Sequence, residues 1–348
     1  MRNRIEGEFM KKYLLPNEGR FYKANLHCHT TDSDGGLSPE QVKAMYKAHG
    51  YSILAITDHE GICNHAELCD EDFLIITGYE ISVDPPTNDW EKAVTCHLNL
   101  FAKEEDNRTL VCYDRYYTRR FEEKFAAELS YTGGDYKRVY SWEGINDIIR
   151  IAGENGFFVS LNHPAWSLQT VDDYKGYEGL WAVEIYNHGC VRSGINRYET
   201  DCYDYLLRQG KRIFCTAADD NHSVLPPEDR RSDCCGGFVM VKAPELQYNA
   251  IIEALLKGTF YASTGAEINE LYFADGKVYL SCSAARSICM TTRYRRAEGY
   301  FAAEGDRLTE AVFNILPTDE YIRFEVEGIH GERAFTNAFY TDELFDQP

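Results

Sequence analysis

The chain repeats one pattern that narrows its possible folds: a short apolar run followed at once by polar residues able to do chemistry. Seven such runs occur, one just before His27 and the others at 51–57, 73–77, 93–96, 157–161, 181–185 and 212–216. Continuous apolar runs separated by helical stretches are typical of parallel strands covered on both faces. Polar residues at the carboxyl ends of such strands are typical of a barrel of βα units. The sequence therefore predicts an α/β fold with a TIM-like barrel.

Helices between the predicted strands have recognisable ends. Ser38 is a suitable N-cap, followed by Pro at the first helical position and Gln41 at the capping-box position, which predicts a helix over 39–49. A second helix is predicted to begin after Ser141, and a third to span 198–208. These helices would connect and cover the strands.

The stretch His27-Cys28-His29 is followed by Asp34 in a Ser-Asp-Gly-Gly turn. Successive side chains in a strand point to opposite faces, so His27 and His29 would share one face while Cys28 takes the other. Two imidazoles on one face can meet at one metal ion. The turn can bring the Asp34 carboxylate back toward the same site as a hard oxygen ligand.

Imidazoles and carboxylates of this kind follow nearly every predicted strand. Nine of them are candidate metal ligands: His27, His29, Asp34, His59, Glu80, His97, His163, Asp220 and His222. The predicted barrel would bring all nine to one end. Crowded imidazoles and carboxylates are costly unless cations bind them. The pattern therefore predicts a cage for divalent cations.

The ordered motifs resemble those of the PHP family, named for polymerase and histidinol phosphatase. They are H-C-H with S-D-G, T-D-H, G-Y-E, a His after the fourth strand, N-H-P and D-N-H. The resemblance covers residues 21–264 and implies a distorted (β/α)7 barrel that holds two or three divalent metal ions, zinc, manganese or iron, at its C-terminal face. The later part of the chain is similar to that of a branch with carbaryl hydrolase-like members.

The same resemblance implies how the nine residues divide among metal sites. The first site would comprise His27, His29, Glu80 and Asp220, the second Glu80, His97 and His163, and the third Asp34, His59 and His222. The family sometimes has His where this chain has Asp34, and oxygen ligation there favours manganese or iron over zinc. Closely spaced metals can share a hydroxide that attacks the substrate. The catalytic residues would then be Glu80, Asp220 and His222.

Polar residues beside the predicted ligands have two interpretations each. Asp219 and Glu60 would either orient an imidazole or be surface carboxylates. Glu184 and Asn187, in V-E-I-Y-N, match a segment common in the PHP family, and would either contact the substrate or make structural hydrogen bonds.

Arginines are the candidate phosphate ligands, because a guanidinium can bind two oxygens at once. The segment after the sixth strand offers His188, Arg192 and Arg197. The long insertion 103–140, rich in charge and Tyr, offers Arg119 and Arg120. Long insertions near a site are often lids, although a surface excursion packed for stability is the alternative.

From about residue 265 the pattern changes to alternating apolar and polar residues. The alternating segments are 270–273, 277–283, 288–294, 311–316, 321–327 and 334–340. Alternation with intervening turns predicts antiparallel hairpins. The sequence therefore predicts two domains: a metal-dependent hydrolase barrel over 1–264 and a small β domain over 265–348 that supports it or mediates contacts.

Composition limits the classes of partner. The chain has 36 Lys and Arg against 56 Asp and Glu, a net charge of −20, which argues against nucleic acid and anionic membranes but permits a small anionic substrate held by metals. We expect no membrane span and no signal peptide, because the apolar runs are too short. Twelve scattered Cys without C-x-x-C pairs are interpreted as reduced thiols, which predicts a cytoplasmic location.

Three functions fit these observations. The first is a metal-dependent phosphoesterase acting on a small phosphate ester, and the second is a metallohydrolase of carboxyl ester, amide or carbamate bonds. The third is a non-catalytic PHP-like binding module, but such modules tend to lose ligands and this chain keeps all nine. The remaining histidines, His49, His65 and His330, are interpreted as structural.

Overall fold

The computed structural model describes residues 11–86, 89–118, 130–131, 135–195 and 198–345. The chain divides into two compact units. One is Arg20–Ala262, and the other joins Ser263–Pro348 to the N-terminal residues up to Gly19. The N-terminal segment belongs with the second unit because its strand β1 (Lys12–Tyr13) pairs with β13 (Ile268–Ala274), whereas the sequence pattern placed it in the first domain.

The larger unit contains a mixed sheet built from the seven predicted strands and one more. Its ladders run in the order β11 (Phe238–Ala243), β2 (Arg20–Asn25), β3 (Ile53–Ile56), β4 (Leu74–Val83), β5 (Cys96–Ala102), β8 (Phe157–Leu161), β9 (Ala182–Asn187) and β10 (Phe214–Ala218). Strands β2, β3 and β4 are parallel to one another, as are β8, β9 and β10.

The prediction for the fourth strand was wrong in position and direction. Strand β5 starts at Cys96, so it contains His97, and it is antiparallel to both β4 and β8. Among its described residues, the connection from Val83 to Cys96 has only a short 3-10 turn, η2 (Trp90–Lys92), whereas parallel neighbours are usually joined by an α-helix. The reversal has a useful result: the start of β5 lies beside the end of β4, with His97 opposite Ser82.

The described strands do not close into the predicted (β/α)7 barrel. Strand β5 reverses direction, and the antiparallel β11 lies beside β2, whereas all neighbouring strands of a (β/α) barrel are parallel. The segments that follow β2 and β10 still meet, because Cys28 bridges Asn221 and the His29 N–H donates to the Asn221 carbonyl at 3.0 Å. This contact brings the first and last predicted strands to one end of the sheet.

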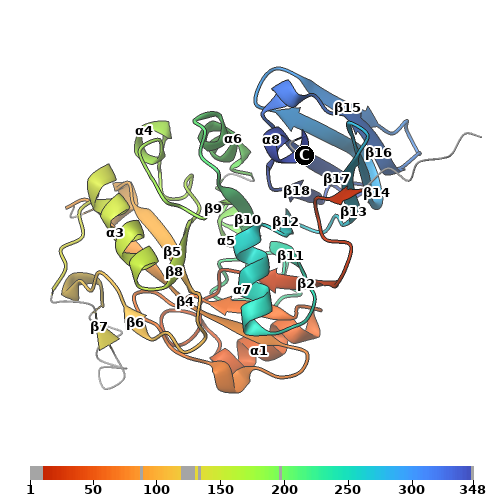
Figure 1. Ribbon diagram of the computed structural model, residues 1–348. Helices are drawn as coiled ribbons and strands as arrows, with labels where there is room; N and C mark the ends of the chain where they lie inside the picture. Colours follow the sequence, from red (N-terminus) through yellow and green to blue (C-terminus); the bar gives the residue numbers. More distant parts are fainter. Residues whose placement is uncertain (1–10, 87–88, 119–129, 132–134, 196–197, 346–348) are drawn as a thin grey trace, which may run out of the picture. The chain divides into compact units, whose positions relative to one another are not determined.

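Three predicted helices are present within two residues of their expected limits. Helix α1 (Pro39–Ala48) has the predicted capping box at Ser38, α3 (Trp142–Glu154) is capped by Ser141, and α6 is Thr200–Arg208. Figure 1 shows α3 alongside β8, against which it packs. Other described helices of this unit include α4 (Val171–Tyr174), α5 (His188–Arg192) and α7 (Tyr248–Lys257). None of the described helices has the length and apolar character needed to cross a membrane.

As predicted, the side chains of His27-Cys28-His29 alternate in direction, and the middle one faces the core. Cys28 is fully buried in a cluster with Tyr46, Tyr51, Phe73 and Phe238. The neighbouring imidazoles point the other way, toward the site described below. The same backbone segment therefore contributes to the core and to the candidate site.

Short elements complete the larger unit. They are η1 (Ala66–Leu68), β12 (Phe260–Ser263), whose last residue the division assigns to the other unit, and the two-stranded pair β6 (Thr109–Leu110) and β7 (Ser130–Tyr131). The pair β6–β7 lies in the predicted lid, 103–140. Arg119, Arg120 and residues 121–129 of this insertion lie outside the described residues.

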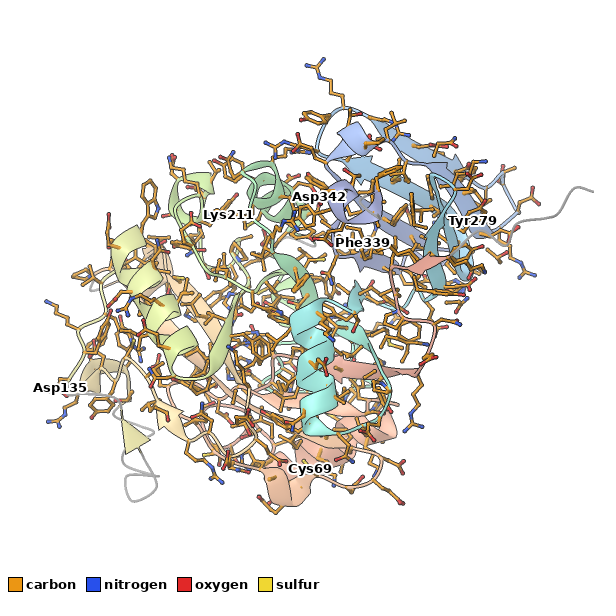
Figure 2. All side chains as sticks on the ribbon, in the orientation of Figure 1. Cys69, Asp135, Lys211, Tyr279, Phe339 and Asp342 are labelled. Atoms are coloured by element: carbon orange, nitrogen blue, oxygen red, sulfur yellow. The ribbon has the colours of Figure 1, made fainter. Side chains whose placement is uncertain are left out.

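The smaller unit is the predicted antiparallel β structure. After β13 come β14 (Lys277–Thr292), β15 (Ala297–Phe301), β16 (Leu308–Asn314), η3 (Pro317–Asp319), β17 (Tyr321–Gly328), β18 (Arg333–Thr336), β19 (Phe339–Tyr340) and α8 (Thr341–Phe345). The segments expected at 277–283 and 288–294 form one long strand, β14, which pairs with four others. Tyr279 on β14, labelled in Figure 2, stacks on Tyr272 of β13 with ring centroids 4.9 Å apart.

Candidate metal centre

The nine predicted ligands converge at the end of the sheet where β2, β3 and β4 finish and β5 begins. Six of them form an inner group: His27, His29, Glu80, His97, His163 and Asp220. The other three form an outer group: Asp34, His59 and His222. The structure thus brings together residues that span nearly two hundred positions of the chain.

Glu80 lies at the middle of the inner group. It is buried on β4, and each of its carboxylate oxygens faces several imidazole nitrogens. Oε1 lies 3.4, 3.2 and 3.5 Å from nitrogens of His27, His97 and His163, and Oε2 lies 3.5 and 3.0 Å from nitrogens of His29 and His59. One carboxylate is therefore shared by five imidazoles from four different segments.

Asp220 approaches the inner group from the end of β10. Its Oδ1 lies 3.1 Å from Nε2 of His27 and 3.0 Å from Nε2 of His29, and its Oδ2 lies 3.7 Å from Nε2 of His163. Asp220 and His163 both have positive φ, 53° and 27°, which is uncommon for residues other than glycine. Such strain tends to occur at functional sites, where the surrounding structure holds it.

The outer group is more open to solvent. The Asp34 carboxylate, 47% exposed, lies 3.8 Å from Nε2 of His59 and 3.5 Å from Nε2 of His222. It also lies 3.8 Å from Nδ1 of His29, so His29 links the two groups. The rings of His29 and His222 stack with centroids 4.4 Å apart.

The geometry fits bound cations. Two ligand atoms that are each about 2.1 Å from one ion, at 90° to 110° to each other, lie roughly 3.0–3.4 Å apart. Most nitrogen–oxygen separations in the inner group fall in or near this range. Two buried atoms, Nδ1 of His29 and Oε2 of Glu80, also lack hydrogen-bond partners, which is costly in a site without cations.

The electrostatics of the cluster require positive charge. Burial would raise the pKa of Glu80, but the surrounding imidazoles, above all that of His27, outweigh it and hold this pKa well below its usual range. The same balance holds the pKa of Asp220 well below its usual range. Burial would lower the pKa of His27, but Asp220 and Glu80 raise it well above normal. Bound cations would supply this positive charge in place of protonated imidazoles.

The outer histidines show the same effect. Burial lowers the pKa of His59, but Glu80 more than compensates and raises it to about 9. Burial also lowers the pKa of His222, but the hydrogen bond to Asp34 and the charges of Asp220 and Asp34 together outweigh it and raise the pKa to about 9. Positive charge near the outer carboxylate thus stabilises the folded state.

Glu184 and Asn187 support ligands from behind. Glu184 Oε1 lies 3.1 Å from Nδ1 of His27, and its Oε2 accepts hydrogen bonds from the His163 N–H and from Asn187 Nδ2. Asn187 Nδ2 also lies 3.1 Å from Asp220 Oδ2. Of the two interpretations offered by the sequence, these contacts favour structural hydrogen bonding over substrate contact.

Glu60 and Asp219 are buried but make their hydrogen bonds elsewhere. Glu60 accepts from the Ser82 N–H at 2.8 Å and from Arg138 Nη1 at 2.6 Å. Asp219 accepts from the backbone N–H groups of 235, 236 and 237 and from the Tyr46 hydroxyl. Burial raises the pKa of Asp219 to about 6 despite these bonds. They hold loops in place, so the surface interpretation was wrong for both.

The predicted phosphate clamp after β9 is only partly described. His188 is buried, its Nδ1 lies 2.8 Å from the Tyr186 hydroxyl, and its Nε2 accepts from Arg192 Nε at 3.2 Å. Burial, with Arg192 second, lowers the pKa of His188 to about 4, so the ring is neutral. Arg197, like Arg119, lies outside the described residues.

A cavity of about 1860 Å³ opens beside the metal ligands. Asp34, His59 and His97 line one side. Residues from the predicted lid line another: Asp114, Tyr116, Tyr117, Lys137, Arg138, Val139 and Tyr140. The residue pattern did not identify the buried Arg138 as a cavity residue. Its position in an insertion rich in Tyr and Arg could have indicated it.

No family model matches the chain. A 66-residue stretch is 42% identical to a 5'-3' exoribonuclease from Haemophilus influenzae, covering 18% of this chain and 24% of that protein. The chain thus matches about a quarter of the length of this curated relative.

The similar solved structures include a two-domain protein from Bacteroides vulgatus that contains a predicted PHP-like metal-dependent phosphoesterase. It is 17% identical, with 97% of this chain and all of that chain covered and a TM-score of 0.44. The likeness is to PHP-like proteins.

Two further structures are more distant. A putative metal-dependent phosphoesterase from Bifidobacterium adolescentis is 16% identical, with 62% of this chain and 91% of that chain covered and a TM-score of 0.37. An amidohydrolase from Chromobacterium violaceum is 16% identical, with 68% and 96% covered and a TM-score of 0.36. At these TM-scores the likenesses do not decide the activity.

Proposed function

We propose that this chain is a metal-dependent phosphoesterase that hydrolyses a small phosphate ester. The observation that carries the proposal is the position of Glu80 and Asp220 between several imidazoles, beside a large cavity. A carboxylate shared in this way can bridge two cations. Sites with two neighbouring metal ions are common in phosphatases and nucleases.

The proposed ligands divide as the sequence motifs suggest. His27, His29, Glu80 and Asp220 would hold one ion, Glu80, His97 and His163 a second, and Asp34, His59 and His222 a third. Zinc, manganese and iron are the candidate metals. Bound ions of this kind lower the pKa of water and neutralise charge on the substrate's oxygens.

The chain's own residues prepare this chemistry. The Glu184 carboxylate accepts a hydrogen bond from Nδ1–H of His27, so Nε2 of that ring is free to face the cation. Carboxylates behind metal-binding histidines commonly act in this way. Ser167, through its Oγ at 3.2 Å, contacts Nδ1 of His163 and turns Nε2 of that ring toward Glu80. We assign proton transfer to the leaving group to Asp220 or His222, which lie at the exposed side of the cluster.

The walls of the cavity suit an anionic substrate that is not a long polyanion. Lys137 and Arg138 are among the lining residues; Arg138 pairs with Glu60 at 2.6 Å, and Tyr117 stacks on its guanidinium at 4.8 Å. Tyr140 and Trp166 offer aromatic surface for the organic part of the substrate. The net charge of −20 repels long polyanions at distance.

The direct test is phosphate release from a panel of monoesters and nucleotides with manganese, zinc or iron. We expect hydrolysis that requires metal and disappears with a chelator. Carboxyl esters, amides and carbamates assayed alongside test the alternative hydrolase, and short RNA tests the activity named for the exoribonuclease that matches 66 residues. Loss of metal from a His27→Ala, His29→Ala double variant with unchanged activity would reject every metal-dependent version.

A further inference from the structure

A separate group of potential metal ligands lies close to the outer group, formed by Asp32, Cys63 and His65. A carboxylate oxygen, a sulfur and an imidazole nitrogen from these residues all lie within 4.8 Å of one another. Asp32 is two residues before Asp34, and the other two follow His59 on the segment between β3 and η1. The PHP motifs account for none of the three.

The imidazole of His65 is the strongest sign of a ligand. Its side chain is only 10% exposed, and its Nε2 has no hydrogen-bond partner among the described residues although it lies 3.3 Å from Oδ2 of Asp32. A buried nitrogen without a hydrogen bond is costly. A nitrogen and an oxygen bound to one tetrahedral zinc ion are about 3.3 Å apart, so this separation suits two ligands of one ion.

Local hydrogen bonds shape the two backbone segments that carry these side chains. Asn64, between the two loop ligands, accepts from the Ala66 N–H at 2.7 Å through its Oδ1. The Asp32 N–H donates to the Thr30 hydroxyl at 3.1 Å. Because both segments are held by such turns, little ordering would be needed to bind an ion between them.

We propose that Asp32, Cys63 and His65 bind an additional transition metal ion of the zinc class. A thiolate with an imidazole selects zinc-like ions over manganese or magnesium, which prefer oxygen. Three protein ligands would leave the fourth position to water. When the ion binds, the Cys63 S–H bond breaks, its proton passes to solvent, and a metal–sulfur bond forms.

The position of this ion suggests what it does. It would tie the loop that carries Asp34 to the segment that carries His59, two ligands of the outer group. It would therefore act as a cross-link that keeps the outer group together. This inference does not depend on the proposed phosphoesterase activity.

Cobalt substitution tests the inference directly. A cobalt–thiolate bond produces a charge-transfer absorption in the near ultraviolet, and the nine proposed ligands of the main centre contain no sulfur. We expect the reduced, cobalt-loaded protein to show this band and Cys63→Ser to lose it. The matched control is Cys289→Ser, which removes a half-buried free thiol from the other unit and should keep the band.

Metal content provides the second readout. Cys63→Ser and His65→Ala should each bind about one zinc ion fewer per chain than the wild type, while circular dichroism reports that both variants fold. A wild-type protein saturated with cobalt but without the thiolate band would overturn the proposal, as would a band that persists in Cys63→Ser. An inactive protein that shows the band would reject the phosphoesterase and leave this site standing.

Discussion

The inner and outer groups use the same ligand types but differ in burial. The side chains of His27, His29 and Glu80 are at most 1% exposed, whereas those of Asp34, His59 and His222 are 47%, 27% and 31% exposed. Charges in the buried group are screened less by water and salt, so they interact more strongly with a cation. The difference predicts a tightly held inner site and a more weakly held outer site.

Glu80→Gln should have the largest effect, because it removes the charge shared across the inner group. We expect metal-dependent turnover to fall about a thousandfold, equivalent to roughly 4 kcal/mol of lost stabilisation. Excess metal should not restore it. The measurement is kcat together with metal content, and Glu245→Gln, an exposed carboxylate away from the site, is the matched control. Full activity in Glu80→Gln would contradict the central role of this residue.

Glu184→Gln should weaken metal binding by the inner group, because Glu184 lies behind its ligand His27. The amide accepts a hydrogen bond from Nδ1–H of His27 less well than the carboxylate does, so we expect metal affinity to fall about 10- to 100-fold. Competition with a chelator measures this change. An unchanged affinity would show that Glu184 does not orient the imidazole.

Asp34→Asn should have a smaller effect that excess metal reverses. A partly exposed charge interacts with an ion by about 1 kcal/mol, so we expect the outer ion to bind less than about tenfold more weakly. Activity measured against metal concentration should shift to higher concentration with the same maximum. If the maximum activity of Asp34→Asn falls as far as that of Glu80→Gln, the distinction between the inner and outer groups is wrong.

The metal-free protein should lose stability as the pH rises. The pKa values of His59 and His222 are raised to about 9 in the folded state, above the unfolded value near 6.5. Their contribution is therefore fully present below about pH 6.5 and lost as the pH rises through 9. We expect Tm of the chelator-treated protein to fall by a few degrees over this interval.

A variant of one of these two histidines is the control for this pH dependence. In His222→Gln the fall in Tm should be smaller, because one of the two raised groups is absent. Metal-loaded protein should not show the fall, because metal binding favours deprotonated ligands. A Tm that rises from pH 6.5 to 9 without metal would contradict the assignment of positive charge to the outer group.

Local sequence signals predicted much of this molecule. Ser38 and Ser141 begin helices as expected, and the motifs His27-Cys28-His29 and Asn162-His163-Pro164 place ligands just after buried strands. Caps, apolar runs and turns depend on neighbouring residues, so they can be identified without knowing the fold. For most of the nine ligands the convergence followed from their position after strands, whereas Glu80 and His97 lie within β4 and β5.

Contacts between distant segments could not be predicted in this way. Arg138 pairs with Glu60 across 78 residues, and Asp219 holds a loop that begins 16 residues later. His65 was interpreted as structural because a single histidine carries no pattern, and only folding brings it to Asp32. Nothing in the residue pattern marked these pairs.

Neighbouring residues in the chain were enough to specify which side chains could bind cations and that they follow buried strands, because such preferences are short-range. The reversal of β5, the open sheet and the different burial of the inner and outer groups arise only when the strands assemble. Strand direction depends on how connections pack against the rest of the sheet, and exposure depends on what covers each side chain. Both are properties of the folded chain as a whole.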